Sequence, residues 1–345
     1  MNRYDRQERV RTIGVAGQRR ICASTILIAG VGALGSYTAS QLVRAGVAHL
    51  ILVDPDIVST TNLQRQALFT EQDVKDQKFK VTAARDHLLA INHNVQIDIY
   101  PEALTKLHLT TLHFDLVCDC LDNFKTRDLL NKAAINQGFD FIFASCAGNF
   151  GSVMAMSPAK HPCLSCLYPN LDSLMQTDCD LIGVNTALVP LVSGLQVSLA
   201  LHYLVDKTGV NFDQLITIDN WQMMQQSYKV NKDHQCPICS RHDWPLTEAP
   251  QAEQLQVLCG TQTYSVKFSA PLTLQTFSNW LTDRNVQSHQ FKRFLTFRWQ
   301  TYAISYFDNG KLLLYGMPTL AAATKIFNDL KQALPIAEEQ EELQK

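Results

Sequence analysis

The chain has 345 residues, 46% of them hydrophobic and 18% charged, and a formal net charge of −2. This length allows two or three domains, and the near-neutral charge argues against nucleic acid or an anionic membrane as partner. The first residues are charged and lack the apolar core of a secretory signal, and the longest apolar run, 187–205, is too short and polar to span a bilayer. We therefore expect a cytoplasmic protein without a membrane segment, whose ten cysteines are metal ligands, reactive thiols or buried side chains rather than disulfides.

A βαβ unit near the N-terminus organises the chain. After a polar, arginine-rich segment (1–22) compatible with a helix, an apolar strand (Thr25–Ala29) enters a glycine-rich turn, a helix runs to about Ala45, and a second strand (His49–Val53) ends at Asp54. Further strands are predicted at 96–100, 114–118 and 139–143, and helices at 80–92 and 125–137. This alternation predicts an α/β fold with a Rossmann-like, doubly wound and mostly parallel sheet.

The pattern changes after residue 149. We predict a strand at 151–156, a buried helix at 187–205 and strands at 215–219 and 223–230. Farther on, a small α+β module is predicted from a strand (256–268), a helix (272–283), a hairpin (294–316) and a helix (320–333). The predicted organisation is therefore an α/β domain (1–240), a linker (241–254), a C-terminal module (255–337) and a frayed tail (338–345).

The glycine turn Gly30-Val-Gly32-Ala-Leu-Gly35 predicts nucleotide binding. Glycines at this spacing allow a tight turn, a close approach of the backbone to phosphate and close packing of helix on strand, while the free amides at the helix start attract anionic oxygen. Asp54, about twenty residues on, is placed to accept a ribose hydroxyl. The alternative is a turn that only packs well. The unit by itself leaves both the nucleotide and the reaction open.

Two CxxC pairs predict a structural zinc site. Each pair, Cys163/Cys166 and Cys236/Cys239, is short enough to place two thiolates on one ion, and together they form a closed set of four sulfur ligands. A redox pair and four buried cysteines are the alternatives. Because the pairs are far apart in sequence, the metal would join distant segments and contribute to folding rather than to catalysis.

Polar side chains follow several predicted strands, at the ends where open parallel sheets bind ligands. Arginine and lysine beside a phosphate-binding turn can neutralise a polyphosphate, and an aspartate at a strand end can hold Mg²⁺. A nicotinamide dinucleotide has less need of these groups, although each residue alone is also compatible with a simple surface charge. The set comprises Asp54, Asp56, Asn62, Arg65, Lys75, Lys78, Lys80 and Asp122.

Cys179 belongs to neither CxxC pair. It falls in a polar stretch (168–180) that we predict to be a mobile loop, where an exposed thiol can act as a nucleophile. The remaining cysteines lie in or beside apolar runs and are predicted to be buried: Cys22, Cys118, Cys120, Cys146 and Cys259.

Several motifs follow one another along the chain: RYDRQ (3–7), GVGALG (30–35), LVDPD (52–56), TNLQRQ (61–66), a lysine opening the next helix, DCLDN (119–123), the two CxxC pairs and CDLIGV (179–184). Taken together, these motifs resemble the ThiF/MoeB/HesA family, the bacterial relatives of ubiquitin-activating enzymes. The resemblance is collinear over about residues 2–240, and the last hundred residues resemble the C-terminal extension of some Gram-positive members.

The resemblance implies ATP-dependent adenylylation of the C-terminal Gly-Gly carboxylate of a small β-grasp sulfur-carrier protein, ThiS-like (thiamine) or MoaD-like (molybdopterin). It implies that the glycine turn and Asp54, with Asp56 nearby, hold ATP. Phosphate contacts are implied for Asn62, Arg65 and Lys80. Lys80 is preferred over Lys78 because Lys80-Val81 aligns with the helix start.

Three further roles follow from the resemblance alone. Asp122 would bind Mg²⁺, and Arg6 corresponds to an arginine that dimers of the family insert into the partner's active site, which implies a homodimer. Cys179 matches a loop cysteine that forms a persulfide or acyl-disulfide link in some members and is dispensable in others.

Other functions remain open at this stage. They are adenylylation of a peptide or a modified tRNA base, a nicotinamide-dependent oxidoreductase, and a non-catalytic scaffold. The sequence leaves undecided which carrier and pathway are served, what donates sulfur, and what the C-terminal module does.

Overall fold

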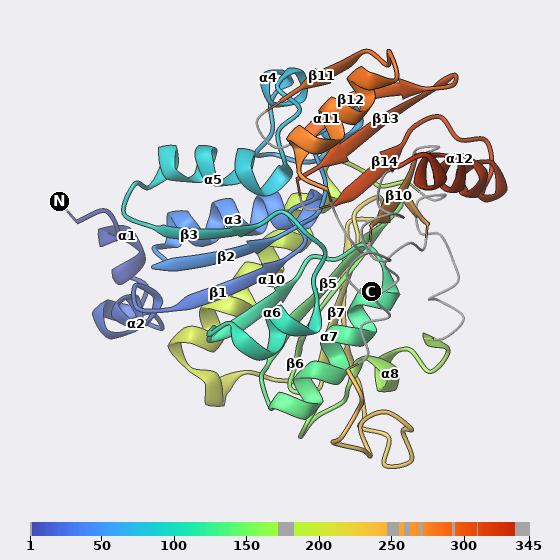
Figure 1. Cartoon of the computed structure of the whole chain (residues 1–345). Coiled ribbons are helices and arrows are strands. Elements are labelled where there is room, and N and C mark those ends of the chain that lie inside the picture. The colour runs from blue at the N-terminus through green and yellow to red at the C-terminus, as the bar shows by residue number, and fades with distance from the viewer. Residues whose placement is uncertain are drawn as a thin grey trace. The chain divides into compact units, whose positions relative to one another are not determined.

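The computed structural model describes residues 2–171, 183–246, 255–258, 263–268, 272–291, 294–308 and 310–334. The chain forms two compact units, Met1–Glu248 and Ala249–Lys345, which are described separately (Figure 1). Cys179, Cys259, most of the predicted linker and the predicted tail lie outside the described residues.

The first unit is built on an eight-stranded sheet in the order β3-β2-β1-β4-β5-β6-β7-β8. The run β3-β2-β1-β4-β5 is parallel, and β6, β7 and β8 continue it in antiparallel pairs, which confirms the predicted α/β class with a mostly parallel sheet. The chain reverses direction across the sheet between β1 and β4, and open sheets bind ligands at such a switch point, beyond the carboxyl ends of the strands. The strands are β1 (Thr25–Ala29), β2 (His49–Val53), β3 (Gln96–Tyr100), β4 (Leu116–Asp119), β5 (Phe141–Ala147), β6 (Phe150–Met156), β7 (Gln214–Asp219) and β8 (Met224–Lys229).

Helices cover both faces of this sheet (Figure 1). Three short ones, α4, α6 and α8, are absent from the sequence-based prediction, because helices of four to six residues leave too few turns for a periodic signal. The helices are α1 (Asp5–Glu8), α2 (Gly14–Ile21), α3 (Ala33–Ala45), α4 (Glu71–Lys75), α5 (Lys80–Ile91), α6 (Lys106–Thr111), α7 (Phe124–Gln137), α8 (Leu164–Leu167) and α10 (Leu188–Val205), with 3₁₀ turns η1 (Thr60–Asn62) and η3 (Lys207–Gly209).

The prediction that 187–205 is too short and polar to span a bilayer is wrong by length and composition, because helix α10 is long and apolar enough to cross a membrane. The helix nevertheless lies against the sheet. The Gln196 carboxamide donates to the carbonyls of Asp119 in β4 (2.9 Å) and Ile142 in β5 (3.0 Å). A Cβ at Gly151 in β6 would lie 2.3 Å from Val192, so the helix approaches the strand backbone closely. These contacts are those of a core helix.

In its described residues, the second unit is an antiparallel sheet in the order β11-β12-β13-β14-β10-β9 with two helices. Phe277 of α11 stacks on Tyr306 of β13 at 4.0 Å, in a core to which α12 also contributes. The sequence predicted one strand over 256–268 and a hairpin over 294–316; the first contains two strands and the second contains three. The elements are β9 (Gln256–Leu258), β10 (Thr263–Lys267), α11 (Leu274–Asp283), β11 (Ser288–Gln290), β12 (Phe294–Trp299), β13 (Tyr302–Phe307), β14 (Lys311–Leu314) and α12 (Leu320–Ala333).

One cysteine prediction is wrong. Cys118 and Cys120 are buried, but Cys22 is exposed and Cys146 is half-buried. The last residue of α2, Ile21, is buried. Because successive residues of a helix point in different directions, Cys22, which follows it, is directed outward.

Candidate active site

The glycine turn connects β1 to α3, and its glycines have two different roles. A Cβ at Gly35 would lie 2.0 Å from the Gly30 carbonyl oxygen, and one at Gly30, whose φ is +90°, would lie 2.7 Å from the Cys120 carbonyl oxygen. At Gly32 the nearest atom is 3.8 Å away, on the Gln66 side chain. Gly30 and Gly35 are therefore required by packing, whereas Gly32 leaves space beside the uncapped N-terminus of α3, where a phosphate can approach.

Asp54, at the end of β2, holds this turn in place. One carboxylate oxygen accepts from the Val31 amide (2.7 Å) and the other from the Asp56 amide (2.9 Å). Burial raises the pKa of Asp54 to about 6, while the charge of Lys80 acts in the opposite direction. The residue predicted to accept a ribose hydroxyl thus also fixes the backbone of the phosphate-binding turn.

Lys80 begins α5, is 7% exposed and lies among the acids of the site. Its ammonium is 3.0 Å from Asp56. Burial alone would lower the pKa of Lys80, but the charges of Asp54 and Asp56 raise it above its ordinary value, and Asp122 adds to the effect. Lys78 instead bonds to Asp73 (3.1 Å), on α4. A desolvated cation therefore stands at the carboxyl edge of the sheet.

The loop after β2 carries two side-chain amides and an arginine. Asn62 is buried and accepts from the Ser59 amide (3.1 Å), so its carboxamide oxygen is already occupied by the loop itself. The half-buried Arg65 donates to the Thr61 carbonyl (2.8 Å). Gln66 is 3% exposed, and the Oε1 of its side-chain carboxamide has no hydrogen-bond partner in the part of the chain that the structure describes. The sequence reasoning did not single out Gln66, although the TNLQRQ motif contains it.

Asp122 lies in the loop between β4 and α7. It is exposed, its carboxylate accepts from the Asn123 side chain (3.2 Å), and its charge contributes to raising the pKa of Lys80. The carboxyl edge therefore unites the glycine turn with three acids and a buried lysine.

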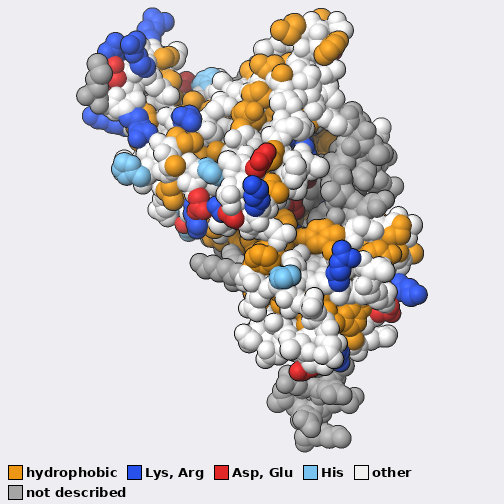
Figure 2. All heavy atoms as spheres, turned by 90° about the horizontal axis from the view of Figure 1, so that it is seen from above, with side chains coloured by type: hydrophobic (Ala, Val, Ile, Leu, Met, Phe, Trp, Pro, Cys, Tyr) orange, Lys and Arg blue, Asp and Glu red, His pale blue; other side chains and the backbone are white. Residues whose placement is uncertain are grey.

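Arg6 lies at the other edge of the sheet, in α1. Its neighbour Gln7 donates to the carbonyl of Ala45, the last residue of α3 (3.0 Å). Because α3 has 13 residues and begins at the glycine turn, this end of α3 is about 20 Å from the turn. Basic side chains gather at this N-terminal end (Figure 2), with six exposed arginines: Arg3, Arg6, Arg9, Arg11, Arg19 and Arg20. Arg6 is thus remote from the nucleotide site of its own chain.

The four CxxC cysteines meet in one cluster. Their sulfur atoms all lie within 4.8 Å of one another, and the Cys163–Cys166, Cys163–Cys236 and Cys166–Cys239 separations are 3.7, 3.7 and 3.6 Å. Four sulfurs about 2.3 Å from a tetrahedral zinc would be about 3.8 Å apart, so the cluster fits a metal of this size. It packs against Ile135 near the end of α7, whereas Asp122 precedes the start of that 14-residue helix. The metal site is therefore about 20 Å from the nucleotide edge.

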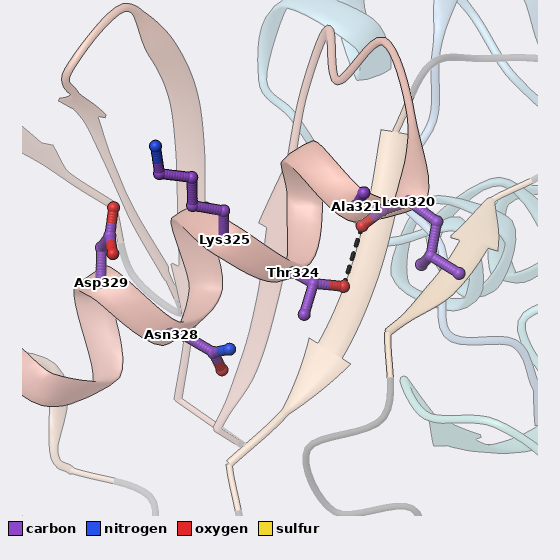
Figure 3. A pocket seen from close by; sticks show the side chains of 6 residues that line it. All are labelled: Leu320, Ala321, Thr324, Lys325, Asn328 and Asp329. Carbon is purple, nitrogen blue, oxygen red and sulfur yellow. Dashed lines mark hydrogen bonds between the residues drawn. The ribbon is translucent and has the colours of Figure 1, made fainter.

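A separate hollow of about 770 Å³ lies in the second unit, on α12 (Figure 3). Its lining contains one lysine and one aspartate, and the Thr324 hydroxyl donates to the Leu320 carbonyl (2.8 Å). It contains none of the residues of the glycine turn or the cysteine cluster. The lining residues are Leu320, Ala321, Thr324, Lys325, Asn328 and Asp329.

These features define a class of protein: a doubly wound nucleotide-binding fold with a four-cysteine metal site. The chain belongs to the ThiF family, whose model matches residues 4–238. It is 31% identical over 335 residues to a sulfur carrier protein ThiS adenylyltransferase of Bacillus subtilis, which covers 94% of this chain and 98% of that protein. The protein of the same name from Escherichia coli is 32% identical over 242 residues, 69% of this chain and 94% of its own length. The protein is therefore a nucleotidyltransferase that uses ATP.

Other similarities agree with this assignment. The protein HesA, heterocyst, of Trichormus variabilis is 30% identical over 241 residues, covering 69% of this chain and 88% of its own. Among solved structures, Escherichia coli MccB with MccA-N7isoASN aligns with a TM-score of 0.61 at 18% identity, over 70% of this chain and 74% of that chain. At this identity the last comparison supports the fold alone.

Proposed function

We propose that the protein adenylylates the C-terminal Gly-Gly carboxylate of a small β-grasp sulfur-carrier protein, ThiS-like or MoaD-like, in the cytoplasm. A carboxylate oxygen of the carrier attacks the α-phosphorus of ATP, and the bond from that phosphorus to the bridging oxygen breaks. The products are a carrier acyl-adenylate and pyrophosphate. The proposal is supported by the ThiS adenylyltransferases that match this chain.

The observation that carries the proposal is the buried Lys80 beside the glycine turn. Its ammonium now neutralises Asp56 at 3.0 Å and is available to the phosphates of a bound nucleotide. Displacement of charge onto pyrophosphate needs fixed cations rather than a protein nucleophile, because the carrier supplies the attacking oxygen. In this proposal Asn62 and Arg65 release their loop contacts to bind phosphate, and Gln66 joins them.

Two metals belong to the proposal. Asp122 would hold Mg²⁺ bound to ATP, since its carboxylate is exposed at a strand end close to Lys80. When bound, Mg²⁺ neutralises phosphate charge. Zinc is the metal proposed for the four cysteines, where it would join the segment after β6 to the segment after β8.

The distant position of Arg6 supports a homodimer. About 20 Å from its own glycine turn, Arg6 can act on a nucleotide only if it reaches the site of a second copy. The active unit that we propose therefore has two chains, each completing the other's site.

The hairpin of β7 and β8 has an exposed apolar tip, which supports docking of the carrier's folded body. Asp119, the last residue of β4, is in register with Phe143 of β5, and β5 continues to Ala147. Strand β5 and the antiparallel strands paired beyond it therefore project four residues past the end of β4. At their tips Trp221 and Met223 are 72% and 86% exposed.

Three strand spacings, about 14 Å, separate β4 from β7 sideways, and the four-residue projection adds about 13 Å along the strands, so the two strand ends are about 20 Å apart. An extended tail of about six residues can cover this distance. A globular carrier seated on the hairpin can therefore place its C-terminal carboxylate near Asp122.

The decisive experiment is ATP–pyrophosphate exchange against a purified panel of ThiS-like and MoaD-like carriers. Exchange is expected only with a carrier ending in Gly-Gly, and Asp122→Ala is expected to abolish it, whereas Asp283→Ala, at an exposed aspartate of the second unit, should not. Exchange driven by a peptide or a tRNA, or tight binding of NADH without ATP binding, would refute the proposed substrate.

The docking surface has its own test. Met223→Glu should raise the KM for the carrier at least tenfold without changing ATP affinity, while Leu107→Glu, at an exposed apolar residue of α6, should change neither. If Met223→Glu instead dissociates the dimer and leaves the carrier KM unchanged, the hairpin is a subunit contact.

A further inference from the structure

The residue before Asp122 is held at both of its backbone polar groups. The Leu121 amide donates to the Asp119 carboxylate (3.0 Å), and the Leu121 carbonyl accepts from the Arg127 guanidinium. The same guanidinium donates to the Ala144 carbonyl in β5 (2.7 Å). The backbone leading into Asp122 is thus attached to an ion pair that is itself attached to the sheet.

This ion pair is buried. Asp119 is fully inaccessible and Arg127 is 3% exposed, with 3.6 Å between the Arg127 Nε and the carboxylate. The guanidinium lies 4.7 Å from the ring centre of Phe143 and 5.5 Å from that of Phe124. Burial raises the pKa of Asp119 to about 6 although the charge of Arg127 acts to lower it. The attraction to Arg127 therefore does not fully offset the cost of burying the charged carboxylate.

A pair of this kind contributes little net stability, because desolvation of two charges offsets most of their attraction. In addition, one Asp119 oxygen and the Arg127 Nε have no hydrogen-bond partner within the described residues. The side-chain hydrogen bonds that this pair makes go to the backbone of Leu121 and Ala144. The arrangement is therefore better suited to fixing the loop than to stabilising the fold.

Asp122 depends on that backbone for its position. Its side chain is exposed, and the hydrogen bond that the structure gives its carboxylate is to the neighbouring Asn123. A shift of the Leu121 peptide would therefore move the carboxylate relative to Lys80 and the glycine turn.

We propose that Arg127, together with Asp119, is a positioning residue that sets the place of the Asp122 carboxylate for Mg²⁺-bound ATP. The inference rests on the proposed function, in which Asp122 holds that ion. It assigns Arg127 no contact with substrate. Its effect on nucleotide binding should therefore require both Mg²⁺ and Asp122.

The test is a double-mutant cycle on ATP affinity, measured by calorimetry with Mg²⁺ and with EDTA. Arg127→Lys keeps the charge but loses the guanidinium Nη2 that donates to both carbonyls. It is expected to weaken Mg²⁺-ATP binding at least fivefold, to leave binding in EDTA within twofold, and to have no further effect in the Asp122→Ala background. Coupled residues deviate from additivity in this way.

Two more variants separate positioning from folding. Asp119→Asn should behave like Arg127→Lys in the same cycle, and it serves as the test if Arg127→Lys does not fold. Leu130→Ala, at a fully buried residue of the same helix, should destabilise the protein without a Mg²⁺-specific loss. Equal losses with and without Asp122, or equal losses with Mg²⁺ and EDTA, overturn the inference.

Failure of the proposed reaction is distinguishable from failure of this inference. If no carrier supports exchange but Mg²⁺-ATP binding still depends on Asp122 and Arg127 as described, the positioning role stands and the substrate assignment falls. If Asp122→Ala leaves Mg²⁺-ATP affinity unchanged, the positioning role falls whatever the reaction.

Discussion

Alanine substitutions at Gly35 and Gly32 are expected to damage different properties of the protein. At Gly35 the new Cβ would lie 2.0 Å from the Gly30 carbonyl oxygen, and real Cβ atoms essentially never approach within 3.0 Å, so α3 and β1 must separate. Overpacking of this kind costs about 3 kcal/mol or more. For a unit of this size that lowers Tm by about 6–12 °C.

At Gly32 the nearest protein atom is 3.8 Å away, an ordinary contact, so Tm should change little. The added methyl group would instead occupy space that a phosphate needs, and ATP affinity should fall at least tenfold, about 1.4 kcal/mol. Gly194→Ala is the control, because it adds a methyl group within α10 with nothing inside 4 Å and should raise stability slightly.

Thermal unfolding followed by circular dichroism and calorimetric titration of ATP separate these effects. The reasoning is refuted if Gly35→Ala melts at the wild-type temperature or if Gly32→Ala binds ATP with wild-type affinity. It also fails if Gly194→Ala is as destabilising as Gly35→Ala, because a general intolerance of alanine would then explain both results.

Three other predictions follow from the site. The purified protein should contain about one zinc per chain, measured by atomic emission. Cys236→Ser should lose the metal and lower Tm, whereas Cys22→Ser should do neither. A wild-type protein that keeps its Tm after its metal is removed would contradict this prediction. ATP affinity should fall as the pH drops through about 6, because protonated Asp54 is a poorer acceptor for a ribose hydroxyl and for the Val31 amide of the glycine turn. The free energy of unfolding should depend on pH in the opposite sense. Because burial raises the pKa of Asp54 from 3.8 to about 6, the stability that this group contributes decreases as the pH rises through that interval. An Asp54→Asn protein should lack both pH dependences. Finally, Lys80→Gln should reduce pyrophosphate exchange at least a hundredfold. Lys78→Gln should keep exchange within threefold but lower Tm, because it removes the bond to Asp73. Equal losses of activity in the two variants would show that the two lysines were wrongly distinguished.

Much of the nucleotide-binding half was predictable because its signals are local. Strands β1 and β2 were predicted with the bounds that the structure has, since each is a short apolar run ended by a glycine or an acid. The pairing of Cys163/Cys166 with Cys236/Cys239 was also predictable, because the number and spacing of thiols match one closed metal site. Short elements such as α6 and β11 were missed, since the six residues of α6 make fewer than two helical turns and the three residues of β11 are all polar.

The sequence by itself determined the α/β class, the glycine turn and the identity of the four metal ligands, because apolar periodicity and fixed spacing are properties of contiguous residues. Only the tertiary structure decided which groups meet: the Lys80 ammonium lies 3.0 Å from Asp56, Lys78 bonds to Asp73, and the Gln66 side chain lies beside Gly32. The same holds for the Asp119–Arg127 pair, whose proposed positioning role depends on bonds to Leu121 and Ala144. Such contacts arise when strands far apart in sequence are placed side by side, and no local pattern of residues records that placement.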